Sequence, residues 1–365
     1  MHDVRQLKVL TGFRFFAAVH VVCFHNFYLF GDLQVLPSFV LKFVQAGDAA
    51  VAFFFILSGF ILTHVYRQKL NTASEKKDYL ISRVVKLYPL YIVGLLLDSP
   101  RVMHYFFSTN ETGIAFLKAS ISGAAYILMI QSWFSPVAAA WNPPAWSLSC
   151  EMFFYIIFIF LLKPFLNLQN KIPMMLICYF IPLVLFAILS QVLNIQSPLF
   201  TVGWIAFPPI RMFEFFMGIL LYGLLEQKGV VAQWVQRNSS LAFWSALVTS
   251  VGLTQFYNAP IDGKIFSHLL LVPLFCVIIL SASYDDVVFK SLFTNKITNY
   301  LGLSSYAIYI LHQPLMSYFL PLMQPSLVLG GIYFIALLLV GCLAHQIYEK
   351  PLQMKIGKKL RSRLG

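Results

Sequence analysis

Residues 9–30 read VLTGFRFFAAVHVVCFHNFYLF, an apolar run long enough to cross a membrane that nevertheless contains Arg14 and His25. These two residues are eleven positions apart. In a helix that spacing is three turns plus about 20°, so both side chains lie on one face, about 16 Å apart along the axis. A charged side chain inside lipid costs several kcal/mol unless it faces a polar interior. The run therefore predicts a membrane helix whose polar face has a function.

The composition as a whole is typical of a polytopic membrane protein. Of the 365 residues, 59% are hydrophobic and 11% are charged, a proportion outside the range of soluble globular domains. Apolar runs follow one another along the chain and leave no room for a separate soluble domain. We therefore expect residues 1–365 to form a single membrane domain. No signal peptide with a small-residue cleavage site is apparent, so the first run is expected to remain as the first helix.

Charge and cysteine content exclude several other classes. The net charge of +12 is spread over short loops between apolar runs, so we expect no binding to nucleic acid. The five cysteines lie in or beside apolar runs, without a CxxC pair or a Cys/His ligand spacing. We expect free thiols, and neither disulfides nor a bound metal.

The positions of the basic residues predict the topology. Lysine and arginine cluster near the N-terminus, in residues 67–86 and in the C-terminal tail, all of which should be cytoplasmic, so the number of crossings is even. The weakest apolar stretch, 114–132, contains Lys118 and Gly123, and we interpret it as re-entrant or interfacial. The prediction is an all-α bundle of about ten spans with both termini cytoplasmic. The apolar stretches are 9–30, 49–66, 80–98, 114–132, 146–165, 173–194, 209–226, 241–257, 265–283, 300–320 and 327–348.

The second apolar stretch has the residues of a closely packed helix, and the third begins with a cluster of cations. The second contains GDAAVAFFFILSGF, whose small residues favour close helix packing over a direct chemical role. The third begins with SRVVKLYPLY, in which Arg83 and Lys86 share one helix face at the cytoplasmic end. Two clustered cations can bind phosphate groups or can simply follow the positive-inside rule, and the residues alone favour the second interpretation.

The fifth apolar stretch contains a carboxylate. The segment WNPPAWSLSCEMFFYIIF, residues 141–158, places Glu151 in an apolar run, on the helix face shared with Ser147 and Tyr155. A carboxylate at that depth must be paired, protonated or in contact with water. We interpret Glu151 as functional, and an ion pair with an arginine is the structural alternative.

Two later segments contribute further polar residues. In PPIRMFEFFMGILLYG, Arg211 and Glu214 are three positions apart, which indicates an intrahelical salt bridge, with substrate contact as the alternative. In LGLSSYAIYILHQPL, Tyr309 and His312 precede a proline. A histidine there can be a hydrogen-bond partner between helices or a group in contact with substrate, and the residues do not decide between the two.

Seven fragments, in order along the chain, resemble the bacterial acyltransferase 3 family of membrane O-acyltransferases. The resemblance implies about ten transmembrane helices in the bacterial inner membrane and an acyl-CoA donor, usually acetyl-CoA, on the cytoplasmic side. It also implies transfer to a hydroxyl of a cell-envelope carbohydrate or glycolipid. Acyl-CoA is then a substrate, and no bound cofactor is expected. The fragments are RFFAAVHVVCFH, FFFILSGF, SRVVKLYPLY, WSLSCEMFFY, RMFEFFMGI, LGLSSYAIYILHQPL and IYEKP.

The resemblance also assigns roles to residues. The arginine-x10-histidine pattern of the family falls on Arg14 and His25, its basic pair falls on Arg83 and Lys86, and its acidic residue falls on Glu151. A lysine keeps the charge of the second basic position but loses the bidentate fork of arginine. The three cations would then hold the phosphates of acyl-CoA.

In that assignment His25 would act as general base or transient acyl acceptor, and Glu151 would orient its imidazole or stabilise the imidazolium. The alternative from another class is a transporter or flippase, in which the same polar residues line a substrate or proton path.

Overall fold

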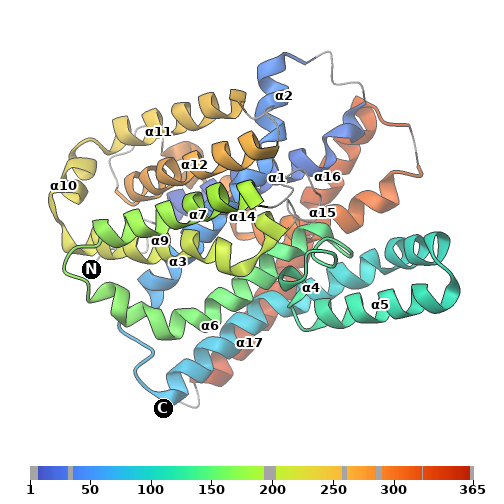
Figure 1. The fold of residues 1–365 in the computed structure, drawn as a ribbon, viewed down its shortest axis with the longest axis horizontal. Helices are drawn as coiled ribbons and strands as arrows, with labels where there is room; N and C mark the ends of the chain where they lie inside the picture. Colours follow the sequence, from blue (N-terminus) through green and yellow to red (C-terminus); the bar gives the residue numbers. More distant parts are fainter. Residues whose placement is uncertain are drawn as a thin grey trace.

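The protein is all-helical wherever the structure describes it. The computed structural model describes residues 7–31, 36–192, 203–256, 261–284, 290–322 and 324–361, and every regular element in these ranges is a helix (Figure 1). Each predicted apolar stretch corresponds to a helix or a pair of helices, which confirms the predicted all-α fold. The helices are α1 (Leu7–Asn26), α2 (Ser38–Gln45), α3 (Ala50–Tyr66), α4 (Ala73–Thr109), α5 (Thr112–Ile127), α6 (Trp146–Leu166), α7 (Ile172–Val192), α9 (Pro208–Gln227), α10 (Val230–Arg237), α11 (Ser239–Leu253), α12 (Ile261–Ala282), α13 (Ser291–Thr294), α14 (Lys296–Leu303), α15 (Ser305–Phe319), α16 (Leu327–Ala344) and α17 (Lys350–Arg361).

In the described part, seven helical segments are long and apolar enough to cross a membrane. Three further expected spans are not among these seven: α11 and α15 have 15 residues each, and in α12 (Ile261–Ala282) the fully described part is Leu269–Ala282. A helix of 15 residues is about 22 Å long, less than the hydrocarbon thickness of about 30 Å. The number of crossings and the orientation of the termini therefore stay predictions.

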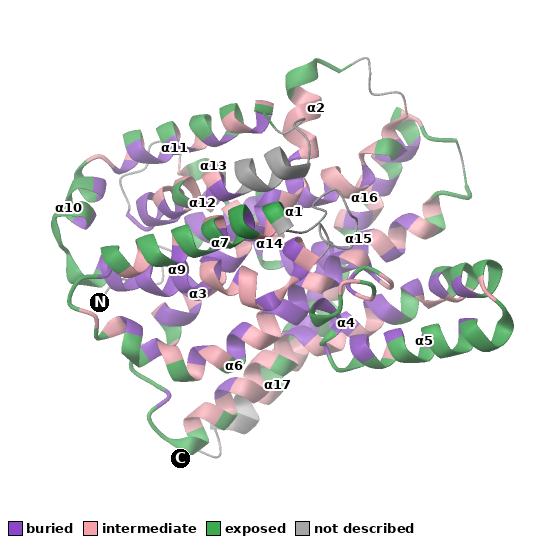
Figure 2. Ribbon diagram, in the orientation of Figure 1, coloured by how far each residue is buried: buried purple, intermediate pink, exposed green. Residues whose placement is uncertain are grey.

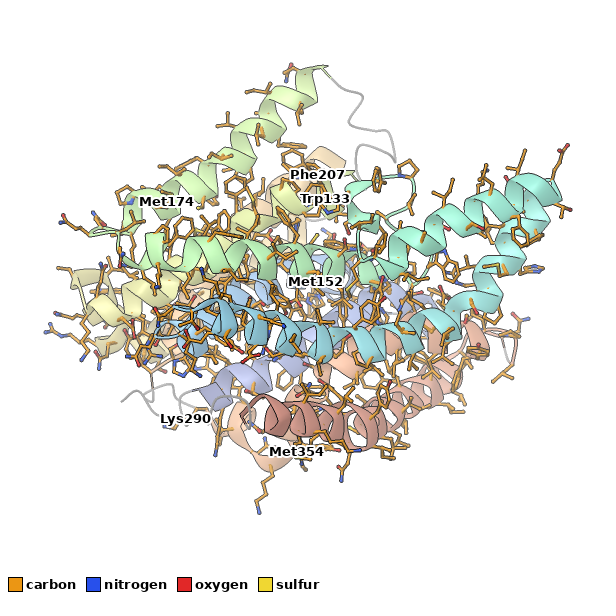
Figure 3. All side chains as sticks on the ribbon, turned by 90° about the horizontal axis from the view of Figure 1, so that it is seen from below. Trp133, Met152, Met174, Phe207, Lys290 and Met354 are labelled. Atoms are coloured by element: carbon orange, nitrogen blue, oxygen red, sulfur yellow. The ribbon has the colours of Figure 1, made fainter. Side chains whose placement is uncertain are left out.

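Helix α1 lies in the middle of the bundle, where it packs against α3, α14 and α15 (Figure 1). Burial is concentrated around α3 and α9, whereas α5 presents an exposed surface (Figure 2). Side chains fill the space between the helices, and Trp133, from the loop before α6, packs against Phe207 at the start of α9, with ring centroids 5.6 Å apart (Figure 3). All five cysteines are free.

Helices α3 and α9 cross at close range, and the crossing depends on two glycines. A Cβ atom added at Gly59 would lie 2.1 Å from the carbonyl oxygen of Phe215, and one at Gly218 would lie 2.0 Å from that of Ile56. Such distances are shorter than any real contact, so the two backbones touch where a side chain would otherwise stand. This confirms the predicted close packing of the second stretch.

Replacing Gly218 by alanine should therefore destabilise the protein. The added methyl group must push α3 and α9 apart, and overpacking of this kind costs about 1–3 kcal/mol. We expect a lower unfolding temperature in detergent, measured by intrinsic fluorescence. The matched control is Gly331→Ala in α16, where nothing lies within 4 Å of the added Cβ atom. Equal unfolding temperatures for the two variants would contradict the prediction.

The C-terminal part of α4 and the whole of α5 form a hairpin that extends away from the rest of the bundle, whereas the N-terminal part of α4 packs within it (Figure 1). With 37 residues, α4 is about 55 Å long, almost twice the hydrocarbon thickness of a bilayer. Apolar side chains of α5 are exposed, among them Phe116 at 66% and Leu117 at 61%. The stretch 114–132 thus folds as α5 and a following loop, and its predicted interfacial placement is not tested by these contacts.

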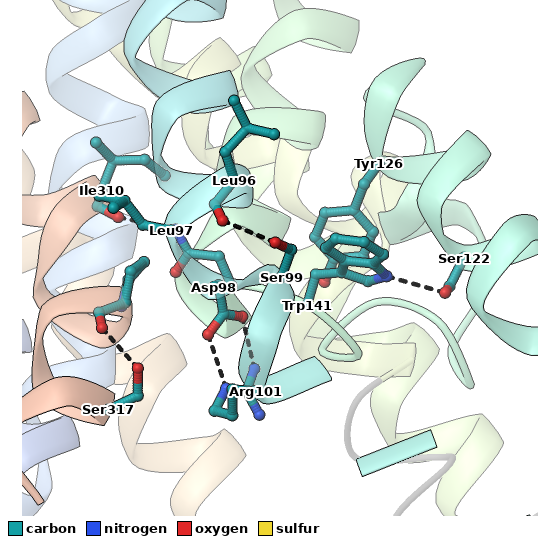
Figure 4. A network of polar contacts seen from close by, with 12 residues as sticks. Leu96, Leu97, Asp98, Ser99, Arg101, Ser122, Tyr126, Trp141, Ile310 and Ser317 are labelled. Atoms are coloured by element: carbon teal, nitrogen blue, oxygen red, sulfur yellow. Dashed lines mark hydrogen bonds and ion pairs between the residues drawn. The ribbon is translucent and has the colours of Figure 1, made fainter. Parts of the chain in front are cut away.

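The base of the hairpin holds a buried ion pair (Figure 4). Asp98 is fully buried, and Arg101 donates to both of its carboxylate oxygens at 2.7 and 2.6 Å. The loop between α5 and α6 is fixed to the same region, because Trp141 donates to Ser122 at 2.9 Å and Tyr126 donates to the carbonyl of Ala138 at 2.8 Å. The hairpin therefore holds this loop against the bundle.

Candidate active site

One cavity gathers the predicted cationic residues, and we call it the basic cavity. Arg14 of α1 lines it together with Arg83 and Lys86 of α4. Glu151 of α6 lines the same cavity, so three cations face one carboxylate. A surplus of positive charge in an enclosed space favours an anionic ligand. The structure thus brings together four residues that lie on three helices.

Aromatic rings hold Arg83 in place within this cavity. Its guanidinium lies over the ring of Tyr66 at 5.6 Å and over that of Tyr155 at 6.0 Å, and its Nε donates to the hydroxyl of Ser82 at 3.2 Å. Glu151 accepts a hydrogen bond of 2.8 Å from Tyr155. Because the half-buried Tyr66 and the buried Tyr155 fix both charged groups, Arg83 and Glu151 are preorganised in this cavity.

A second cavity contains His25, and we call it the histidine cavity. Its other lining residues are uncharged: Ala138, Ala139, Pro143, Trp146, Ile205 and Ala206. Trp146 lines the histidine cavity and its neighbour Ser147 lines the basic cavity, so the first turn of α6 stands between the two. The hydroxyl of Tyr309 also lies in this wall, 2.8 Å from the hydroxyl of Ser147 and donating to the carbonyl of Pro144 at 3.0 Å.

His25 is paired with His312, one of the residues that the sequence left between two interpretations. Nδ1 of His25 and Nε2 of His312 are 3.1 Å apart. His312 is completely buried, and its Nδ1 is hydrogen-bonded to the carbonyl of Tyr309. A second contact between helices supports the pair: Asn26 donates to the hydroxyl of Tyr333 at 3.0 Å, which donates to the carbonyl of His312 at 2.8 Å. Helices α1, α15 and α16 are therefore tied together at this point.

The loop before α6 is hydrogen-bonded to the helix of His312 at a carbonyl that a proline leaves without its helical partner. Pro314 has no N–H group, so the carbonyl of Ile310 lacks its usual helical partner. Nδ2 of the buried Asn142 donates to that carbonyl at 2.8 Å. The loop that lines the histidine cavity is therefore anchored beside the histidine pair.

The two residues predicted to be catalytic line different cavities. Glu151 is bonded to Tyr155, whereas His25 is bonded to His312. Among the contacts of the described residues, none joins Glu151 to His25. The position next to the imidazole, which the sequence reasoning gave to Glu151, is taken by His312.

The remaining predicted pair forms the intrahelical salt bridge that its spacing indicated. Arg211 and Glu214 form a buried intrahelical salt bridge of 3.0 Å. The guanidinium of Arg211 also lies 5.6 Å from the centre of the Trp146 ring and 5.3 Å from that of Phe55. The pair thus packs, through Arg211, against Trp146, which lines the histidine cavity.

Sequence reasoning missed two buried carboxylates. Asp98 lies at the end of the third stretch, and its partner Arg101 follows one turn later, a spacing that could have indicated the pair. Glu349 lies in a single π-helical turn, His345–Glu349, and accepts from His345 at 2.8 Å. No group of three or more His, Cys, Asp or Glu side chains suited to a metal ion occurs in the part of the chain that the structure describes.

Comparison with known proteins gives a consistent result. Residues 7–346 match the acyltransferase 3 family model, described as an acyltransferase domain. The chain is 28% identical to the acyltransferase MdmB of Streptomyces mycarofaciens over 386 aligned positions, which cover 98% of this chain and 94% of that protein. No solved structure matches the chain.

Proposed function

The chain belongs to the acyltransferase 3 family, and on that premise we propose that it moves an acyl group from cytoplasmic acyl-CoA to a hydroxyl of a cell-envelope carbohydrate or glycolipid. The proposed acyl group is acetyl and the proposed location is the bacterial inner membrane. One observation carries the proposal: α1 places Arg14 in the basic cavity and His25 in the histidine cavity. A single helix thereby connects an anion site with a base.

The basic cavity is the proposed donor site. Arg14, Arg83 and Lys86 would bind the phosphates of acyl-CoA, since charge-assisted hydrogen bonds to phosphate are among the strongest that a protein makes. By the positive-inside rule, the basic residues before and within the first turns of α4 support a cytoplasmic location for this end, which is the side that would supply acyl-CoA. Glu151 is proposed to hold Tyr155 and to limit the net charge of the site.

The histidine cavity is the proposed acceptor site. His25 would take the proton of the acceptor hydroxyl while its oxygen attacks the carbonyl carbon of the thioester. The C–O bond forms, the C–S bond breaks, and the departing thiolate of CoA receives the proton from the imidazolium. Ser147 and Tyr309, in the wall between the cavities, mark where thioester and hydroxyl would meet.

Product formation by purified protein tests the proposal. The protein is reconstituted in lipid nanodiscs with acetyl-CoA, with and without a mixture of envelope glycans. Free CoA and acetylated glycan are measured by mass spectrometry, because the five free cysteines would react with a thiol reagent. The proposal predicts acceptor-dependent release of CoA and an equal amount of acetyl ester. A transporter or flippase would leave acetyl-CoA intact, and that result would overturn the proposal.

A further inference from the structure

We infer that His312 is a positioning residue that fixes the tautomer of His25, so that Nδ1 of His25 carries the proton and Nε2 carries the free lone pair. This inference deepens the proposed function, since it rests on His25 being the base. It follows from three groups in a row: the carbonyl of Tyr309, the ring of His312 and the ring of His25.

The first link decides the protonation of His312. A backbone carbonyl oxygen can only accept a hydrogen bond, so Nδ1 of His312, which is bonded to the carbonyl of Tyr309, must be the donor. A neutral imidazole has one N–H group, and complete burial favours the neutral ring. Nε2 of His312 is therefore an acceptor.

The second link decides the protonation of His25. Nε2 of His312 is 3.1 Å from Nδ1 of His25, and an acceptor at this distance requires a donor opposite. Nδ1 of His25 must carry its proton, which leaves Nε2 unprotonated in the neutral ring. Any other choice of tautomers places two lone pairs or two protons against each other. Since His25 lines the histidine cavity, its free ring nitrogen is the one available to a hydroxyl there.

The surroundings keep this arrangement in one geometry. The carbonyl of His312 accepts from Tyr333, and Tyr333 accepts from Asn26, which follows His25 in the chain. In serine proteases an aspartate holds the base histidine in the correct tautomer and stabilises the imidazolium. Here a neutral imidazole takes the first of these roles, and it still accepts from Nδ1 of His25 after proton transfer.

Two substitutions at His312 separate positioning from packing. His312→Gln retains an oxygen near the position of Nε2 that can accept from His25, whereas His312→Phe keeps the ring volume and removes the acceptor. We expect His312→Phe to lower kcat by roughly 10²–10⁴-fold, the usual contribution of a general base, with little change in the KM for acetyl-CoA. His312→Gln should recover most of that loss. His20→Phe, another histidine of α1, is the control and should keep the kcat of the wild-type protein.

A spectroscopic measurement reads the tautomer without activity. In protein labelled with ¹⁵N-histidine, the two ring signals that disappear in His25→Ala belong to residue 25. We expect the Nδ1 of His25 to be protonated and its Nε2 to be unprotonated in the wild-type protein, and a shift toward the opposite tautomer in His312→Phe. A protonated Nε2 in the neutral wild-type ring, or an unchanged kcat in His312→Phe, would overturn the inference. Failure of the proposed function is distinguishable, because the wild-type protein would then form no acetyl ester, whereas the ring signals of His25 still report its tautomer.

Discussion

Replacing His25 by alanine is expected to abolish acyl transfer while the protein still folds and inserts. The substitution removes the ring that faces the histidine cavity, and a general base contributes roughly 10²–10⁴-fold to the rate. The measurement is acceptor-dependent formation of acetyl ester in nanodiscs. Binding of acetyl-CoA, followed by isothermal titration, should remain close to wild type because the basic cavity is untouched.

The control for this variant lies on the same helix. His20→Ala also removes an imidazole from α1, but Nε2 of His20 is bonded to the carbonyl of Phe43 and the residue does not line either proposed substrate site. It should retain transfer. Incubation of the wild-type protein with acetyl-CoA alone, followed by intact-mass measurement, distinguishes a base from a transient acyl acceptor, which would gain one acetyl group. Near-normal transfer by His25→Ala would refute its assignment.

Reversing the charge at Lys86 is expected to weaken the binding of acetyl-CoA. A hydrogen bond to a charged group contributes about 1.5–3 kcal/mol, so Lys86→Glu should raise the KM for acetyl-CoA by roughly 10–100-fold. A matching loss is expected for Arg83→Glu, whereas Lys86→Arg should retain or improve binding because a guanidinium adds a bidentate contact. The measurement is the KM for acetyl-CoA at a fixed acceptor concentration.

Two controls separate phosphate binding from a general effect of charge. Lys163→Glu changes the charge at an exposed position near the end of α6, on the same predicted side of the membrane and outside the basic cavity. Acetylated pantetheine, which lacks the phosphates and nucleotide of CoA, should be used equally well by wild type and Lys86→Glu. A similar rise in KM for both donors would show that Lys86 does not contact phosphate.

The sequence predicted the helices well because long apolar runs leave few alternatives to a membrane helix. It also predicted that Arg14, Arg83 and Lys86 act together at one site. The residues alone favoured the positive-inside rule as the reason for the basic pair, and only the family pattern favoured phosphate binding. What one sequence cannot give is the rotation of each helix against its neighbours. Glu151 and Ser147 share a face of α6, and it is the packing of α6 on α3 and α4 that turns this face to the basic cavity.

The pairing of His25 with His312 could not be predicted either, because it also depends on how the helices pack against one another. The two residues are 287 positions apart, and their contact depends on α1 lying beside α15. The number of spans stays a prediction, because apolar composition does not show where a helix stops. Ser304, for example, separates α14 from α15 within a stretch that reads as one apolar run.

The hydrogen bond from Asn142 to the carbonyl freed by Pro314 has a consequence for how such proteins diverge. One amide and one proline, on different elements, join the loop to α15, in addition to the contacts that hold it to the hairpin of α4 and α5. The neighbouring loop residues Ala138 and Ala139 line the histidine cavity but take no part in that anchor through their side chains. Their exchange for larger or polar residues would change the lining of the proposed acceptor site without removing the bond from Asn142 or the histidine pair. On the proposed function, we therefore expect acceptor preference to vary through these two loop residues independently of the proposed donor site.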